Sequence, residues 1–248
     1  MPPRRTPRRE FEEETGGPTW IWGVHACLAA LTNPARRIER VVATRNAALR
    51  LPESADLQIL DPGAIDGMLP PGAVHQGVAV RALPLAPLSL EAACAPLDAR
   101  SVLILDGVTD PQNVGAAFRS AAAFGARAVV LQDRKSPPLT GALAKAAAGA
   151  IELLPHVRVS NLARTIETLR TLGYLTVALE GEAELDLGAA FVGTRPIALV
   201  LGAEGKGLRP GIAEACEARA RIAIAPEMES LNVAAAAAIA LYEAARRR

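Results

Sequence analysis

The chain has 248 residues and a formal net charge of +1; half of its residues are hydrophobic, and only 3% are aromatic. A near-neutral chain is not a polycation, so any affinity for nucleic acid must come from local basic patches. A core built mainly from Ala, Val, Leu and Ile favours an α/β architecture with buried strands.

The cysteines and the N-terminus exclude several classes of protein. Cys27, Cys94 and Cys216 lie far apart, form no CxxC pair and have no histidine at metal-ligand spacing. We therefore expect neither a disulfide framework nor a bound metal. No uninterrupted run of about 18 apolar residues could span a membrane. The Pro- and Arg-rich N-terminus lacks the apolar segment of a secretory signal, so we expect a cytoplasmic protein.

Residues 1–18 are rich in Pro, Arg and Glu, which predicts a disordered tail. Residues 19–95 have the pattern of a small α/β domain. Its predicted elements are a helix at 24–31, strands at 38–43, 57–60 and 75–80, and a further helix before 57–60. Prolines 84, 87 and 96 predict a linker over about residues 82–99.

Arginines cluster around the first predicted strand of this domain. They are Arg36, Arg37, Arg40, Arg45 and Arg50, with only Glu39 to oppose them. Such an excess of positive charge suits the phosphates of RNA. A solvated face without a binding role gives the same pattern, and the sequence leaves both interpretations open.

Residues 100–248 alternate between predicted strands and helices, which indicates a mainly parallel sheet. The predicted strands are 102–105, 128–131, 153–157, 175–179, 197–201 and 221–224. The predicted helices are 113–124, 140–148, 162–172, 207–218 and 231–247. Ligands of such folds bind where the strands end.

The first loop at a strand end, residues 106–113, leads into the helix that carries Asn113 and Arg119. Asn113 lies near the helix start, where Asn is a good N-cap. Arg119 is the one charge in an apolar helix. If its side chain faces inward it needs an anion, such as a carboxylate or an RNA phosphate; the alternative is an exposed Arg beside an apolar helix.

The second loop, LGAEGKGL at 201–208, is rich in glycine but is no phosphate loop. The Walker A pattern needs a Ser or Thr after GK, and the dinucleotide pattern GxGxxG is absent. Its glycines allow close approach of the backbone to a ligand, and Glu204 adds a carboxylate.

The third loop, PEMESLN at 226–232, precedes an Ala-rich helix. Ser230 is placed to cap that helix, and Asn232 falls in its early turn. The run of alanines predicts close packing against another backbone. No histidine lies in any of the three loops, so a Ser–His nucleophile is not indicated.

Together the three loops resemble the motifs of the SpoU (TrmH-like) family of RNA ribose 2′-O-methyltransferases, in particular its 23S rRNA guanosine branch. The patterns are DxxxDPxNxGAxxRxAxxFG at 106–125, LGxEGxGL at 201–208 and ESLNVxxAxAI at 229–239. The stretches WGVHACLAAL at 22–31 and HQGVAV at 75–80 are similar to the L30e-like domain that precedes the catalytic domain in many members.

This resemblance implies a SPOUT-type α/β catalytic domain over residues 100–248 with a C-terminal trefoil knot, and an L30e-like RNA-binding domain over residues 19–95. It implies S-adenosylmethionine as methyl donor, large-subunit rRNA as substrate, and a homodimer formed through the catalytic domains. The implied catalytic and substrate residues are Asn113, Arg119, Glu204, Ser230 and Asn232. The implied methyl-donor residues are Leu179, Leu201, Gly202, Gly207, Ile222, Ile224 and Leu231.

The implied reaction moves a methyl group from a sulfonium to a ribose hydroxyl, which loses its proton. A guanidinium does not give up its proton in proteins, so we expect Arg119 to act electrostatically, with Glu204 orienting it or a neighbouring donor. Two other functions remain open: a tRNA guanosine 2′-O-methyltransferase, and a non-catalytic RNA-binding or ribosome-assembly factor on the same fold. The domain at 19–95 argues against the first, and the five catalytic positions argue against the second.

Overall fold

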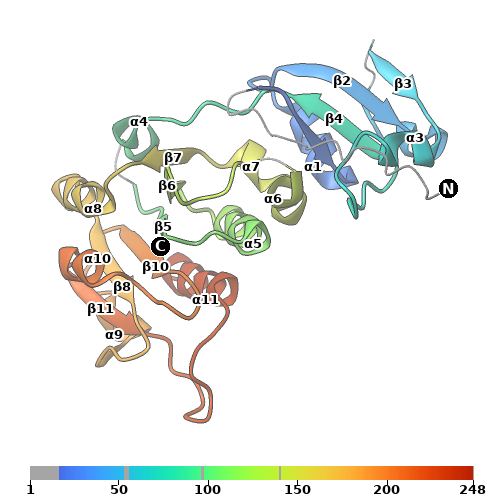
Figure 1. The fold of residues 1–248 in the computed structure, drawn as a ribbon. Coiled ribbons are helices and arrows are strands. Elements are labelled where there is room, and N and C mark those ends of the chain that lie inside the picture. The colour runs from blue at the N-terminus through green and yellow to red at the C-terminus, as the bar shows by residue number, and fades with distance from the viewer. Residues whose placement is uncertain (1–16, 53–55, 96–97, 140, 248) are drawn as a thin grey trace.

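The computed structural model describes residues 17–52, 56–95, 98–139 and 141–247. Within these residues the strands form two sheets, one of four strands and one of seven (Figure 1). Most of the predicted tail at 1–18 lies outside the described residues. No helix in the described ranges has the length and apolar character needed to cross a bilayer, and no cluster of three or more His, Cys, Asp or Glu side chains there could hold a metal.

The smaller sheet is built from the N-terminal part of the chain in the order β1-β4-β2-β3. Its strands are β1 (Thr19–Trp22), β2 (Ile38–Ala43), β3 (Leu57–Ile59) and β4 (Val78–Ala82), and its helices are α1 (Val24–Thr32), α2 (Arg45–Ala48) and α3 (Pro62–Asp66). The strand predicted at 75–80 begins later, because Gln76 (φ 56°) and Gly77 (φ 85°) form a turn. In that turn Gln76 accepts a hydrogen bond from the backbone N–H of Val24 (3.1 Å) and so satisfies the start of α1.

The predicted linker at 82–99 contains a short helix that was not predicted, α4 (Leu90–Cys94). Ser89 caps this helix by accepting a hydrogen bond from the N–H of Ala92. Leu90 and Cys94 are buried against the larger sheet. The prolines that indicated a linker lie before and after α4, where they do not interrupt it.

The larger sheet is parallel at every pairing described, in the order β7-β6-β5-β10-β8-β11-β9. Its strands are β5 (Val102–Asp106), β6 (Ala128–Gln132), β7 (His156–Val159), β8 (Leu175–Leu179), β9 (Leu185–Asp186), β10 (Ile197–Gly202) and β11 (Ala218–Arg221). The α/β prediction with a mainly parallel sheet is confirmed. Strand β10 lies between β5 and β8, although β8 precedes it in the chain.

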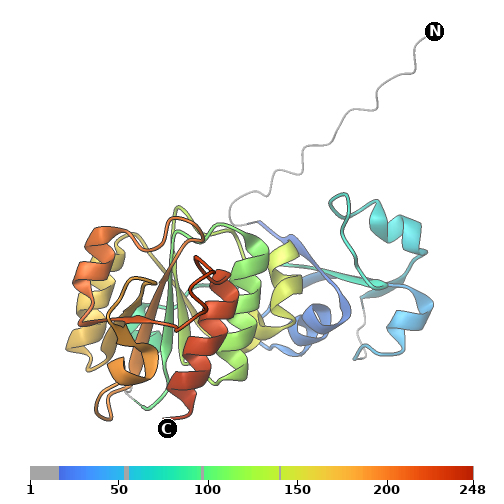
Figure 2. The same cartoon turned by 90° about the horizontal axis from the view of Figure 1, so that it is seen from below.

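Helices cover both faces of this sheet (Figure 2). They are α5 (Pro111–Ala123), α6 (Gly141–Ala147), α7 (Ala150–Leu153), α8 (Leu162–Thr171), α9 (Leu187–Ala190), α10 (Pro210–Ala215) and α11 (Val233–Ala245). Alternate residues of β5 serve the two faces: Leu103 and Leu105 pack with α5, α6 and α11, whereas Val102 and Ile104 pack with α8 and α10.

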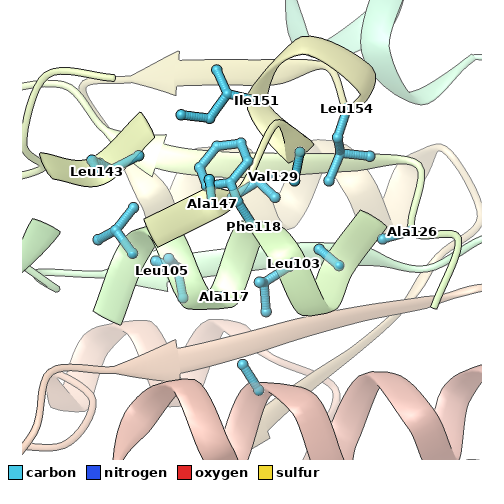
Figure 3. Packing of buried hydrophobic residues seen from close by; sticks show 14 of the residues in the cluster. Leu103, Leu105, Ala117, Phe118, Ala126, Val129, Leu143, Ala147, Ile151 and Leu154 are labelled. Atoms are coloured by element: carbon cyan, nitrogen blue, oxygen red, sulfur yellow. The ribbon is translucent and has the colours of Figure 1, made fainter. Parts of the chain in front are cut away.

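On the face of the sheet that carries Leu103 and Leu105, small residues let α5 and α6 approach each other closely (Figure 3). A Cβ on Gly115 would stand 2.6 Å from the carbonyl oxygen of Leu143, so only glycine fits there. Phe118 fills the space beside this contact and is fully buried between Leu103, Ala147 and Ile151.

Several element boundaries differ from the predictions. The strand predicted at 221–224 is β11 at Ala218–Arg221, and the helix predicted at 207–218 is confined to α10. The strand predicted at 153–157 is β7, preceded by the unpredicted α7. The predicted helix at 231–247 begins two residues later, at Val233.

A buried ion pair joins the loop before β2 to helix α7. Arg36 binds Glu152 of α7 through two hydrogen bonds, and their side chains are only 2% and 4% exposed. Asn33 donates a further hydrogen bond to Glu152 (2.8 Å), and Arg36 also donates to the carbonyl of Leu83. Arg36 is therefore not part of an RNA-facing patch, whereas Arg37, Arg45 and Arg50 are exposed.

Candidate active site

The carboxyl ends of β5, β8 and β10 meet at one edge of the larger sheet, because parallel strands end on the same side. Beside them lies a cavity of about 360 Å³, a size suited to a small-molecule cofactor. All seven predicted cofactor residues line it: Leu179, Leu201, Gly202, Gly207, Ile222, Ile224 and Leu231. The predicted catalytic residues Glu204 and Ser230 also line it.

The glycine loop that forms one wall of this cavity folds back on itself after β10. The N–H of Gly207 donates to the carbonyl of Ala203 (2.8 Å), and both Gly205 (φ 75°) and Gly207 (φ 62°) have left-handed backbones. A Cβ on Gly202 would stand 2.1 Å from the carbonyl carbon of Gly207. The loop therefore needs glycine at 202 for space and favours glycine at 205 and 207 for conformation.

Two asparagines and a glutamate form a polar cluster at the rim of the cavity. The amide of Asn232 donates to Oδ1 of Asn113 (2.9 Å), and both amides approach Oε2 of Glu204, at 3.4 Å from Asn113 and 3.5 Å from Asn232. The three residues come from the start of α5, the glycine loop and the start of α11. Residues 91 and 119 positions apart in the chain thus converge on one point.

The helix starts beside this cluster differ from the predictions for Asn113 and Ser230. Asp110 caps α5 by accepting from the backbone N–H groups of Gln112 and Asn113. Asn232 caps α11 by accepting from Ala234 (2.9 Å) and Ala235 (3.4 Å). Capping by Asn113 and by Ser230 was therefore wrong, since the acceptor in each case is a different side chain. The side chain of Asn113 is left to bond Asn232 and Glu204.

Arg119 lies on the exposed face of α5, two turns beyond the helix start. Among the described residues it makes no ion pair, and Glu204 bonds the two asparagines rather than Arg119. Its exposure corrects the interpretation of an inward-facing, buried Arg. A free guanidinium on this face can meet the phosphate of an incoming polyanion.

One ion pair supports the site and was not found from the sequence. Asp106, at the end of β5, is 2% exposed; its two carboxylate oxygens share the Nε–H of Arg209, and one of them also accepts from Nη2 at 2.7 Å. It also accepts from the backbone N–H of Arg209 (3.3 Å). This contact ties the end of β5 to the residue that follows the glycine loop. The position of Asp106, directly after an apolar run, could have indicated a buried carboxylate that needs a cationic partner.

The charge around the cavity is negative. Glu180, Glu204 and Glu229 line it, and no Lys or Arg does so among the described residues. Apolar side chains, including Leu179, Ile222 and Leu231, form the rest of the cavity wall and can pack against an apolar group. A ligand with a flat apolar group and a cationic centre matches both features.

The chain is thus an α/β protein whose parallel sheet carries a cofactor-sized cavity and a carboxylate–amide cluster at its carboxyl edge, as in enzymes that bind a small-molecule cofactor there. Comparison with known families makes this specific. A sequence model of the SpoU rRNA Methylase family matches residues 100–242, and the chain belongs to that family.

Named relatives extend the likeness over most of the chain. The 23S rRNA (guanosine-2′-O-)-methyltransferase RlmB of Photobacterium profundum is 41% identical over 244 residues, covering 92% of this chain and 97% of that protein. The protein of the same name from Vibrio cholerae is 39% identical over 242 residues, covering 92% and 96%. The SpoU methyltransferase AviRb of Streptomyces viridochromogenes, solved with AdoMet, has a TM-score of 0.77 at 22% identity over 93% of this chain and 90% of that one, which shows a shared fold.

Proposed function

We propose that the protein transfers a methyl group from S-adenosylmethionine to the ribose 2′-hydroxyl of a guanosine in 23S rRNA. The family, and relatives named as 23S rRNA guanosine methyltransferases whose similarity covers 92% of the chain, support this activity. The observation that carries it is the Asn113–Glu204–Asn232 cluster at the rim of a cavity lined by every predicted cofactor residue.

The cavity fits S-adenosylmethionine in size and chemistry. Gly202 and Gly207 let the backbone itself form part of the cavity wall, Leu179, Ile222 and Leu231 offer apolar contacts to an adenine, and the surrounding carboxylates favour a sulfonium. The cofactor supplies an electrophilic methyl group; in the reaction the O–C bond forms, the S–C bond breaks and the hydroxyl proton leaves.

We assign positioning of the reacting ribose to Asn113, Asn232 and Ser230. Glu204 holds the two amides in a fixed orientation through its Oε2. Arg119, exposed on the same helix as Asn113, would bind a phosphate of the substrate or stabilise the developing alkoxide, with the proton passing to phosphate or water.

The proposed function also implies a division into two domains and a knotted catalytic domain. We infer an L30e-like RNA-binding domain over residues 19–95 and a catalytic domain over 100–248, supported by the two separate sheets. A trefoil knot in the catalytic domain is supported by β10 lying between β5 and β8, and by the return of the chain after β11 to pack α11 on α5 and β10. Action on rRNA also implies a cytoplasmic protein.

We further infer a homodimer formed through α11. Its outer face exposes Ile239 (42%) and Tyr242 (51%), two large side chains one helical turn apart that a second copy of the chain could cover. Light scattering should give the mass of two chains for the wild type, and Ile239→Asp should give one. A wild type with the mass of one chain at micromolar concentration would contradict the dimer.

Methyl transfer from labelled S-adenosylmethionine tests the function directly. The purified chain should label a 23S rRNA transcript, with the label on one guanosine ribose, and a deletion strain should lack one 2′-O-methyl group that its parent carries. Labelling of tRNA instead would show that tRNA, and not 23S rRNA, is the substrate. No labelling of any RNA would refute the proposed methyltransferase activity.

A further inference from the structure

We propose that a second cleft, between the smaller sheet and the start of α5, binds a nucleotide of the RNA within a few positions of the one that is methylated. This inference rests on the proposed function and adds to it a site separate from the cofactor cavity. The cleft has a volume of about 420 Å³. Trp22 and Val74 of the N-terminal part line it together with Gln112, Pro137 and Lys145 of the catalytic part.

The position of the cleft places it close to the reaction. Pro111 and Gln112, which form part of its wall, directly precede Asn113 in the first turn of α5. Residues in one helical turn rise about 1.5 Å each, so the cleft and the Asn113–Glu204–Asn232 cluster are neighbours along the same helix end. An RNA strand that presents a ribose to the cluster therefore passes this cleft within a few nucleotides.

The chemistry of the lining suits a nucleotide. Lys145 is the cation in the cleft, no carboxylate lines it, and within the described ranges no ion pair neutralises Lys145. By contrast, the cofactor cavity is lined by Glu180, Glu204 and Glu229. The walls of the cleft are otherwise apolar, from Trp22 and five prolines, and Gln112 adds an exposed amide. A base against apolar walls with its phosphate near an ammonium meets all three features.

The cleft is also preformed, because the two parts of the chain that line it are fixed to one another. The buried Arg36–Glu152 pair joins the loop between α1 and β2 to α7. Helix α6, which carries Lys145, packs on β1 and on α5, and Figure 1 shows it between them. The side chain of Lys145 lies against the backbone at Gly23, where a Cβ would stand 3.5 Å from its Cγ. A rigid cleft costs little ordering on binding.

The test compares binding of a 23S rRNA transcript to Lys145→Ala, Lys145→Arg and a matched control, Lys135→Ala, whose side chain is exposed outside the cleft. Lys145→Ala should raise the Kd for RNA about fivefold and reduce the slope of log Kd against log salt by about 0.7 to 0.9, the share of one phosphate contact. Lys145→Arg should keep the wild-type slope, and Lys135→Ala should change neither quantity.

A second variant tests the cleft without touching its cation. Val74 is 60% exposed, so Val74→Asp adds a carboxylate to the wall at little cost in folding. It should weaken RNA binding while the calorimetric Kd for S-adenosylmethionine stays as in the wild type. The proposal that RNA binds in this cleft would be refuted by an unchanged RNA affinity and salt slope in Lys145→Ala. Equal losses of RNA and cofactor binding in both variants would refute it as well. Absence of methyl transfer by the wild-type protein would instead reject the proposed function.

Discussion

Replacement of Gly202 by Ala tests whether the glycine loop forms the cofactor cavity. The added Cβ would stand 2.1 Å from the carbonyl carbon and 2.2 Å from the oxygen of Gly207, and 2.3 Å from the N of Leu208. All three atoms belong to the backbone, so no side chain can rotate away. The loop must move by more than 1 Å to restore ordinary contact at about 3.5 Å.

This displacement should affect ligand binding more than folding. Overpacking of this kind costs about 1–3 kcal/mol, which lowers Tm by about 2–12 °C in a chain of this size. The loop lies at the surface and can relax, so the protein should still fold. The same movement displaces Gly207 and Glu204, which line the cavity, so the affinity for S-adenosylmethionine should fall at least about a hundredfold, as when a positioned contact is lost.

Gly211→Ala is the matched control. It lies in the first turn of α10, a Cβ there meets nothing within 4 Å, and it lines no part of the cofactor cavity. We expect unchanged cofactor binding and equal or slightly higher stability, by up to about 1 kcal/mol. Calorimetric titration and thermal unfolding of the three proteins give both quantities. Wild-type cofactor affinity in Gly202→Ala would refute the assignment of this loop to the methyl donor.

Three further predictions concern Arg119, the buried ion pair and a buried histidine. Arg119→Lys should lower kcat at least about tenfold with unchanged cofactor affinity, since an ammonium lacks the planar fork of the guanidinium; near-wild-type turnover and RNA affinity would remove Arg119 from the reaction. Glu152→Gln leaves its guanidinium partner buried without a counter-charge and should cost about 3 kcal/mol in urea unfolding, whereas the exposed Glu167→Gln should cost almost nothing. Burial lowers the pKa of His156 from 6.5 to about 4. The unfolded chain therefore binds a proton that the folded chain does not between these pH values. The free energy of unfolding should fall by about 3 kcal/mol from pH 6.5 to 4 on this account. His156→Gln should reduce that slope relative to the wild type, and an unchanged slope would contradict the assignment.

Most strands of the larger sheet were predictable because buried parallel strands have short, continuous apolar sequences. Every residue of β5 is buried, and four of the five residues in its sequence VLILD are apolar, as expected for a strand covered on both faces. Strand β11 was misplaced by three residues for the opposite reason. Its sequence ARAR suits a helix as well as a strand, and its pairing with β8 and β9 decides between them.

The candidate site was predictable where the strand-end rule applies. That rule and the family motifs together indicated Asn113, Glu204 and Asn232, which the structure brings into hydrogen-bond contact. The Asp106–Arg209 pair was not predictable, because its members are 103 positions apart and only the sheet order brings them together. The interpretation of Arg36 as an RNA contact failed similarly, since its partner Glu152 is 116 positions away.

The two ends of the Asn232 amide perform different tasks. Its oxygen holds the first turn of α11, and its nitrogen holds Asn113. Opening of that turn by thermal fluctuation therefore also releases the amide from the cluster, long before the protein unfolds as a whole. Activity should then decline with temperature ahead of the global transition. Asn232→Asp would keep the acceptor that caps α11 but set a second carboxylate against Glu204, so it would separate the stability of this helix start from the integrity of the cluster.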